Sequence, residues 1–271
     1  MTDNAQSIKF KLSYQNGTAD DHHLDMYDAA ISYLGFAKAI NITVNAILNK
    51  QVKVKGNQSG GFKVYLDTSK KGSFEQFITI IIDNPSLTAS TIVLGASGSA
   101  LWDGIKYVFG GVLGVIQPKP PKKIMDRIEP ILDDLHQALE TPLQEAHRPI
   151  VNDDEIEIEI TSGRKQGVIK LDKNTLREIS SSTSQKIEVR KGNVTKFSNI
   201  SYIGRYYDEE LDKTESFHSE ALTQYEQELL VWSLHESLKD INKGKLEITV
   251  IPIKTKTGKL KRYDFLEVKK A

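Results

Sequence analysis

Two hydrophobic periodicities alternate along the sequence, and they restrict the chain to a fold that combines helices with sheets. In SIKFKLSYQ, residues 7–15, hydrophobic and polar side chains alternate, as in a strand with one buried face. Residues 23–49 instead repeat hydrophobic side chains at helical spacing, after the acidic residues that favour a helix start. The alternation returns in QVKVKG, GFKVYLDT and SFEQFITIIID. This order predicts an α+β fold, with an antiparallel or mixed sheet covered by one long helix.

The second half of the chain is predicted to be rich in strands. It opens with EIEIEIT, continues through further alternating segments, and ends with a helix at about 219–241 and a hairpin. The segment HRPIVNDDE interrupts the periodicity, and 271 residues are enough for one large domain or two of ordinary size, of which we favour two. We therefore predict an N-terminal α+β domain at 1–84, a helical segment at 85–148 that includes a Gly/Ala-rich stretch, and a C-terminal β-rich domain with one helix at 149–271.

The Gly/Ala-rich stretch TASTIVLGASGSALWDGIKYVFGGVLGVIQPKPPKK, residues 88–123, admits three interpretations. It contains no charge before Asp103, but Asp103 and Lys106 lie where a membrane span would need about 20 predominantly apolar residues, which disfavours a constitutive transmembrane helix. Small residues recur at every fourth position, a spacing that lets two helix backbones approach closely. The stretch is therefore a buried helix, a surface for self-association, or a segment that enters a membrane conditionally.

Glycine in a helix is less favourable than alanine by roughly 1 kcal/mol, so the glycines of this stretch require a compensating contact. On this argument we predict a non-enzymatic assembly or sensing protein that self-associates through residues 88–117. The predicted assembly residues are Ala96, Ala100, Gly104, Gly110 and Gly114. If Gly104 lies at a crossing between subunits, its replacement by Leu would give a smaller, folded species. The predicted partners are further copies of the chain or another protein, with membrane contact and nucleic acid as alternatives.

The terminal hairpin concentrates positive charge in a chain whose 36 basic and 36 acidic residues balance. A basic ribbon that also contains aromatic side chains can contact phosphates or single-stranded bases. The alternative function is therefore a nucleic-acid-binding module. Its predicted contact residues are Lys259, Lys261, Arg262 and Tyr263. The acidic run at 208–215 argues against it, because opposite patches in one domain often pair within or between subunits.

No motif in the sequence predicts catalysis. The chain contains no cysteine, which excludes disulfides, thiolate nucleophiles and thiolate metal sites. His22, His23 and Asp25 form the one close group with metal-ligand chemistry, but adjacent positions of a helix point in different directions, so a hydrolase ranks third. We predict no catalytic residue, no metal and no cofactor. The start of the chain lacks the apolar core of a signal peptide, which predicts a cytoplasmic location. Association with a membrane on activation is an alternative for the Gly/Ala-rich stretch.

Several short motifs resemble those of a family of uncharacterised bacterial two-domain proteins, known only as domains of unknown function. The motifs are ADDHHLDMYDAAISYLGFAKAI, KKGSFEQ, LWDGIKYVF, AHRPI, GNVTKFSNISYIGRYYDEEL and GKLKRYDF, which together extend over most of the chain. The patchy occurrence of such families is similar to that of mobile-element and antiphage-defence genes, which implies a sensor or effector role by association. The resemblance transfers no catalytic residue.

Overall fold

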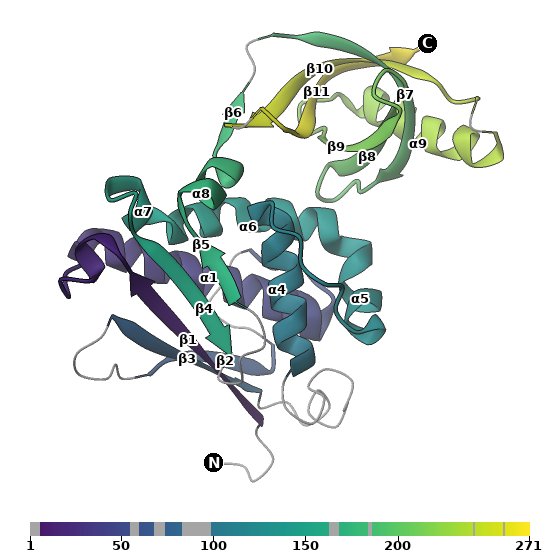
Figure 1. The fold of residues 1–271 in the computed structure, drawn as a ribbon. Coiled ribbons are helices and arrows are strands. Elements are labelled where there is room, and N and C mark those ends of the chain that lie inside the picture. The colour runs from purple at the N-terminus through teal and green to yellow at the C-terminus, as the bar shows by residue number, and fades with distance from the viewer. Residues whose placement is uncertain are drawn as a thin grey trace. The chain divides into compact units, whose positions relative to one another are not determined.

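The computed structural model describes residues 6–54, 60–67, 74–82, 99–162, 168–183, 186–240, 242–256 and 258–271. They form two compact units, residues 1–179 and residues 180–271, each with its own sheet (Figure 1). The fold class is α+β, as predicted. The division of the chain differs from the predicted one, because position 149 lies inside the first unit.

The first unit contains an antiparallel sheet of five strands in the order β2-β3-β1-β4-β5. The strands are β1 (Gln6–Gln15), β2 (Phe62–Leu66), β3 (Glu75–Ile82), β4 (Glu157–Ser162) and β5 (Val168–Leu171). β4 pairs with β1, from Phe10 opposite Ser162 to Gln15 opposite Glu157. The EIEIEIT strand, which we predicted to open the C-terminal domain, therefore extends the N-terminal sheet.

Helices α1 and α4 lie against one face of this sheet, and α6 packs against these two helices (Figure 1). The helices of the unit are α1 (Met26–Asn49), α4 (Ser99–Leu113), α5 (Lys122–Ile128), α6 (Leu132–Ala146), α7 (Arg148–Asn152) and α8 (Lys173–Ile179), with 3-10 turns at Gly17–Ala19 and Glu129–Ile131. α1 is the long helix predicted from the sequence, and it begins where the Asp25 carboxylate accepts hydrogen bonds from two backbone N–H groups. Within the described part of the chain, α1 alone is long and apolar enough to cross a membrane, and 67% of its apolar window is buried in the fold.

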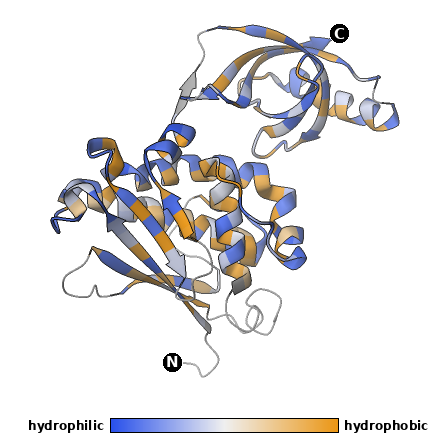
Figure 2. Ribbon diagram, in the orientation of Figure 1, coloured by the Kyte–Doolittle hydropathy of each residue, from blue (hydrophilic) through white to orange (hydrophobic). Residues whose placement is uncertain are grey.

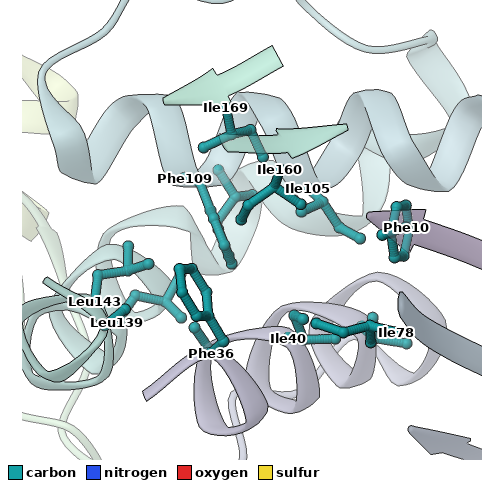
Figure 3. Close-up of a cluster of buried hydrophobic side chains, with 14 of the residues drawn as sticks. Phe10, Phe36, Ile40, Ile78, Ile105, Phe109, Leu139, Leu143, Ile160 and Ile169 are labelled. Carbon is teal, nitrogen blue, oxygen red and sulfur yellow. The ribbon is translucent and has the colours of Figure 1, made fainter. Parts of the chain in front are cut away.

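The core of the first unit lies between the sheet and these helices. Ile8, Phe10, Leu12 and Tyr14 of β1 are buried, as their alternation predicts, and the strands in Figure 2 alternate between hydrophobic and hydrophilic residues. Figure 3 shows the side chains that meet in this core, which are Phe10, Ile78, Ile160 and Ile169 from the strands, Phe36 and Ile40 from α1, Ile105 and Phe109 from α4, and Leu139 and Leu143 from α6.

The second unit is a barrel with one helix. Its elements are β6 (Ser181–Thr183), β7 (Glu188–Phe197), β8 (Ile203–Asp208), β9 (Lys213–His218), α9 (Gln224–Lys239), β10 (Leu246–Thr255) and β11 (Leu260–Lys270). The strands close into a ring, because β11 pairs with both β9 and β10 in the order β7-β8-β9-β11-β10-β7. The β9–β11 pair is parallel, the other pairs are antiparallel, and β6 pairs with the end of β10 outside the ring.

This connectivity is that of the OB fold, a five-stranded Greek-key barrel, with the helix between the third and fourth strands of the ring. β7 changes partner at Gly192, pairing with β10 before this position and with β8 after it. A Cβ on Gly192 would collide with the carbonyl oxygen of Tyr207. A glycine is therefore required where the first strand of the barrel passes from one neighbour to the other.

Candidate nucleic-acid interface

Aromatic side chains fill the inside of the barrel. Tyr206, Phe217, Tyr263 and Phe265 are almost completely buried, and the rings of Phe217 and Phe265 stack with their centroids 4.2 Å apart. Because side chains alternate across a strand, the residues between these aromatics lie on the outer face of β8, β9 and β11. The barrel is thus a packed core, and any ligand surface has to be built from its outer face and its loops.

Tyr263 belongs to this core, which corrects its prediction as an aromatic contact for nucleic acid. Its side chain is 1% exposed, and its hydroxyl donates a hydrogen bond to Oδ2 of the buried Asp208 over 2.7 Å. Burial, followed by this hydrogen bond, holds the pKa of Tyr263 above its ordinary value. Its ring cannot stack on a base, because the alternation of β11 turns it inward.

The basic residues of the hairpin fall into two groups at its opposite ends. Lys269 forms an ion pair with Glu247 over 2.8 Å, and the Lys270 ammonium lies 4.2 Å from the centre of the Trp232 ring. These two cations therefore contribute to contacts within the second unit.

The other cations surround the turn between β10 and β11. They are Lys254, Lys256, Lys259, Lys261 and Arg262. Lys256 and Lys259 are exposed, and the backbone N–H of Thr255 donates to the carbonyl of Lys259 over 2.8 Å, which closes the hairpin. Three of the four predicted nucleic-acid residues thus lie at or beside this turn.

The acidic run between β8 and β9 has partners elsewhere in the barrel. Glu209 forms an ion pair with Lys245, Glu210 with Arg190 over 2.5 Å, and Glu215 with Lys213 over 2.5 Å. Asp212 accepts a hydrogen bond from the Tyr207 hydroxyl over 2.5 Å. These contacts engage the carboxylates that we expected to oppose nucleic-acid binding, and none of the partners named here belongs to the hairpin turn.

Two of the predicted assembly residues are buried within the first unit. Ala100 is 8% exposed, and Gly104 of α4 is buried. A Cβ on Gly104 would lie 2.8 Å from Cδ1 of Ile47 in α1 and 3.0 Å from Cγ2 of Ile124 in α5. The missing side chain of Gly104 lets α4 approach α1 and α5, which agrees with the buried interpretation at this position.

The remaining assembly residues have different surroundings. Gly110 is buried, and a Cβ there would lie 2.7 Å from the carbonyl oxygen of Val115. Gly114 is exposed and has φ of +71°, which places it in the left-handed conformation that follows a helix end. Ala96 lies outside the described residues. Self-association through residues 88–117 stays a prediction.

His22, His23 and Asp25 lie near a hollow of about 390 Å³ at the start of α1, although His22 does not line it. The hollow is lined by Thr18, His23, Leu24, Asp25, Asp28, Pro149, Asn152, Asp153 and Ile156. Its carboxylates have structural partners, because Asp25 caps α1, Asp28 binds Arg148 over 2.9 Å, and Asp153 accepts from the N–H of Thr18 over 2.9 Å. Among the residues that the structure describes, no three His, Cys, Asp or Glu side chains could hold a metal ion.

Sequence reasoning missed the outer face of the barrel. Arg205 and Tyr207 lie on β8, Ser216 and His218 lie on β9, and all four are partly exposed. The alternation in IGRYYD and KTESFH indicates that these positions share a face within each strand. It does not indicate which strands become neighbours, so the sequence alone could not bring them together.

Residues 10–117 match the family model described as Domain of unknown function (DUF7946). This match lies within the first unit and extends from β1 to the residues just after α4, so it confirms the resemblance to an uncharacterised family over that part of the chain. No curated protein and no solved structure matches the chain.

Proposed function

We propose that the second unit binds single-stranded nucleic acid through the outer face of its barrel and the turn between β10 and β11. The observation that supports this function best is the closed ring of strands with OB connectivity. OB folds bind oligonucleotides with the face of their second and third strands and with the loops after the first and fourth strands. In this chain those elements are β8 and β9, residues 198–202, and residues 256–259.

The distribution of charge supports an anionic ligand. The cations at the hairpin turn lie at the loop after the fourth strand of the ring, which is one of the two loops used by OB folds. Contacts with backbone phosphates supply most of the affinity of nonspecific nucleic-acid binding. The flexible side chains of lysines can place their ammonium groups against successive phosphates. The partners of the acidic run reduce its opposition to such a ligand.

Tyr207 takes the stacking role that we first assigned to Tyr263. It lies on the outer face of β8, partly exposed, with its hydroxyl held by Asp212. Stacking of one base on an aromatic side chain contributes about 1–3 kcal/mol and tolerates any base. The arrangement therefore favours a single strand with accessible bases over a duplex.

Fluorescence anisotropy with a labelled deoxythymidine 15-mer, an RNA of the same length and a DNA duplex tests this function. We expect binding to both single strands that weakens steeply with salt. Replacing Lys256, Lys259 and Lys261 by Gln should flatten the slope of log K against log salt by about two units, because each phosphate contact in a single strand contributes about 0.7.

The matched control removes three lysines from other parts of the second unit. Lys191 lies on the first half of β7, and Lys239 and Lys243 lie at and just beyond the end of α9. Their replacement by Gln changes the net charge equally and should leave the salt slope within a few tenths of the wild-type value. If the wild-type chain binds none of the three nucleic acids at low salt, the proposed function is wrong.

Self-association is a second candidate, supported by the exposed end of the predicted assembly stretch. Val115 is 40% exposed and Ile116 is 99% exposed. If copies of the chain meet there, light scattering during size-exclusion chromatography should show an oligomer, and Ile116→Asp should reduce its mass without unfolding the chain, because it places a charge in an apolar contact. A wild-type chain that is monomeric at micromolar concentration would refute this candidate.

A further inference from the structure

The segment between α4 and α5 combines exposed apolar side chains with exposed lysines. It comprises residues 114–123, GVIQPKPPKK, and we call it the α4–α5 segment (Figure 1). Ile116 is 99% exposed and Val115 is 40% exposed. The exposed cations of the segment are Lys119, Lys122 and Lys123. An apolar pair and three cations thus share one surface segment of the first unit.

The end of α4 explains why Val115 is not covered. Gly114 has φ of +71°, and the backbone N–H of Val115 donates to the carbonyl of Gly110 over 2.8 Å, as in the Schellman motif. In that motif the residue after the left-handed position often packs on a side chain one turn back in the helix. Here that position is Gly110, which has no side chain. The helix end therefore presents Val115 and Ile116 without the apolar contact that frequently accompanies the motif.

The rest of the segment is restricted by prolines and anchored at α5. Pro118, Pro120 and Pro121 each fix φ near −65°, Pro120 is buried, and Pro121 is the residue before the first turn of α5. In α5, the Arg127 Nε donates to the carbonyl oxygen of Ile47 over 2.6 Å, which ties this helix to α1. Because the segment is already ordered, little conformational entropy is lost when it meets a surface.

The charge of this region is positive. Residues 114–128 contain one acid, Asp126, and four bases, Lys119, Lys122, Lys123 and Arg127. Within the described part of the chain, the three lysines have no ion-pair partner. Glu178 of α8 lies beside Gly114, since a Cβ there would be 3.1 Å from its Cγ. The excess positive charge is therefore on the α5 side of the segment.

From this arrangement we propose that the α4–α5 segment docks the protein on an anionic membrane surface. Val115 and Ile116 enter the boundary between headgroups and acyl chains, while the lysines contact the anionic headgroups. Lysine suits this position, because its apolar stem can lie along the boundary while its ammonium group stays in water. The contact is peripheral: α4 has 15 residues, fewer than the about 20 that a membrane span requires.

Charge favours lipid over a second copy of the chain at this segment. At a two-fold contact the same surface of both copies meets, so the lysines near Ile116 in the two copies would face one another. Like charges oppose such a contact, whereas an anionic lipid surface attracts each lysine. The proposal does not depend on nucleic-acid binding, which we assign to the second unit.

Co-sedimentation of the full chain with lipid vesicles tests this contact. Phosphatidylcholine vesicles with about one third phosphatidylserine should bind the chain at least about tenfold more tightly than phosphatidylcholine alone. Ile116→Asp should weaken binding to the anionic vesicles at least about tenfold, because a carboxylate replaces the apolar tip, and Ile116→Leu should retain binding. Replacing Lys119, Lys122 and Lys123 by Gln should also weaken it at least about tenfold, since each lysine near the surface contributes a factor of about five. Replacing them by Arg should retain it.

Two matched controls alter the same charges elsewhere. Met26→Asp places a carboxylate at an 88% exposed apolar side chain at the start of α1. The second control is the chain with Gln at Lys191, Lys239 and Lys243, which changes the net charge as the lysine variant of the segment does. Both should bind the anionic vesicles as the wild-type chain does, and circular dichroism should show that every variant is folded.

The outcomes separate this proposal from the other two. If the wild-type chain binds neither kind of vesicle, or if Ile116→Asp and the lysine variant of the segment bind as tightly as the wild-type chain, the membrane contact is wrong. An oligomer that Ile116→Asp dissociates, without vesicle binding, would assign the segment to self-association instead. The lysine variant of the segment should bind the deoxythymidine 15-mer as the wild-type chain does, so a failure of nucleic-acid binding leaves the vesicle result decisive.

Discussion

His147 is fully buried between the end of α6 and the start of α7, and its side chain contacts α8. Its Nδ1 lies 2.6 Å from the carbonyl oxygen of Leu143, and its Nε2 lies 2.9 Å from Oγ1 of Thr175. Burial lowers the pKa of His147 to about 4, from an ordinary value of 6.5, because the charged ring would lose its hydration. The unfolded chain therefore binds a proton between these two values that the folded chain does not bind.

The free energy of unfolding should consequently decrease as the pH falls. Above about pH 6.5 the ring of His147 is neutral in both states, and its contribution to the free energy of unfolding is fully present. As the pH falls from about 6.5 to the folded-state pKa of about 4, this free energy decreases by about 1.4 kcal/mol per pH unit. Urea unfolding between pH 7.5 and 4.5 measures this slope. His147→Gln should flatten it, whereas His235→Gln, at a site whose side chain is 66% exposed, should not. Equal slopes in the wild-type chain and in His147→Gln would contradict the assignment.

At the scale of elements, the packing of α4 against α1 and α5 determines the effect of a larger side chain at Gly104. Ile47 and Ile124 lie where a Cβ would project, so Leu at this position overpacks a crossing within one chain. We expect Gly104→Leu to lower the free energy of unfolding by about 1–3 kcal/mol with no change of molecular mass. This outcome replaces the smaller folded species that the sequence led us to expect.

Thermal unfolding and light scattering check this expectation together. The control is Ala37→Leu, which adds the same side chain at an exposed position of α1 and should leave both the melting temperature and the mass nearly unchanged. A Gly104→Leu chain that is as stable as the wild-type chain but smaller in solution would show that this glycine faces another subunit instead.

The elements themselves could be predicted wherever one periodicity dominates. β1 alternates without interruption, and α1 begins after an aspartate that caps it. The partner of β4 could not be predicted, because β1 precedes it by more than 140 residues and an alternating strand fits either sheet. The assignment of Tyr263 failed for a related reason, since a hairpin sequence fixes which residues share a face and not which face is buried.

The candidate site could be predicted only in part from the sequence. The cations around Lys259 stand out because they are local in the chain. The position of β11 beside β9 depends on a parallel pairing of strands that are distant in the chain, and no local sequence pattern encodes it. The sequence shows how many charged residues the hairpin contains, but only the pairing register of the strands shows where they lie on the barrel.

At the scale of the whole molecule, the two units have separate hydrophobic cores. The core of the first unit includes residues of α1, α4, α6 and five strands, and that of the second consists of barrel residues and α9. Each unit also contains one of the two tryptophans of the chain, Trp102 in α4 and Trp232 in α9. Trp102→Phe and Trp232→Phe therefore give chains in which fluorescence reports one unit at a time.

We expect the two units to respond independently to mutation. Glu226 holds α9 in place, since its carboxylate accepts hydrogen bonds from the N–H groups of Thr223 and Val268 over 2.9 and 3.0 Å. Glu226→Ala should lower the free energy of unfolding of the second unit by about 1–2 kcal/mol, which lowers the urea midpoint reported by Trp232. The midpoint reported by Trp102 should stay unchanged. Gly104→Leu should do the reverse. Because the two hydrophobic cores consist of different residues, we expect a perturbation of one core to leave the stability of the other unchanged. If both midpoints shift together for either variant, the chain unfolds as one cooperative unit, and the boundary at residue 180 does not separate two independently stable parts.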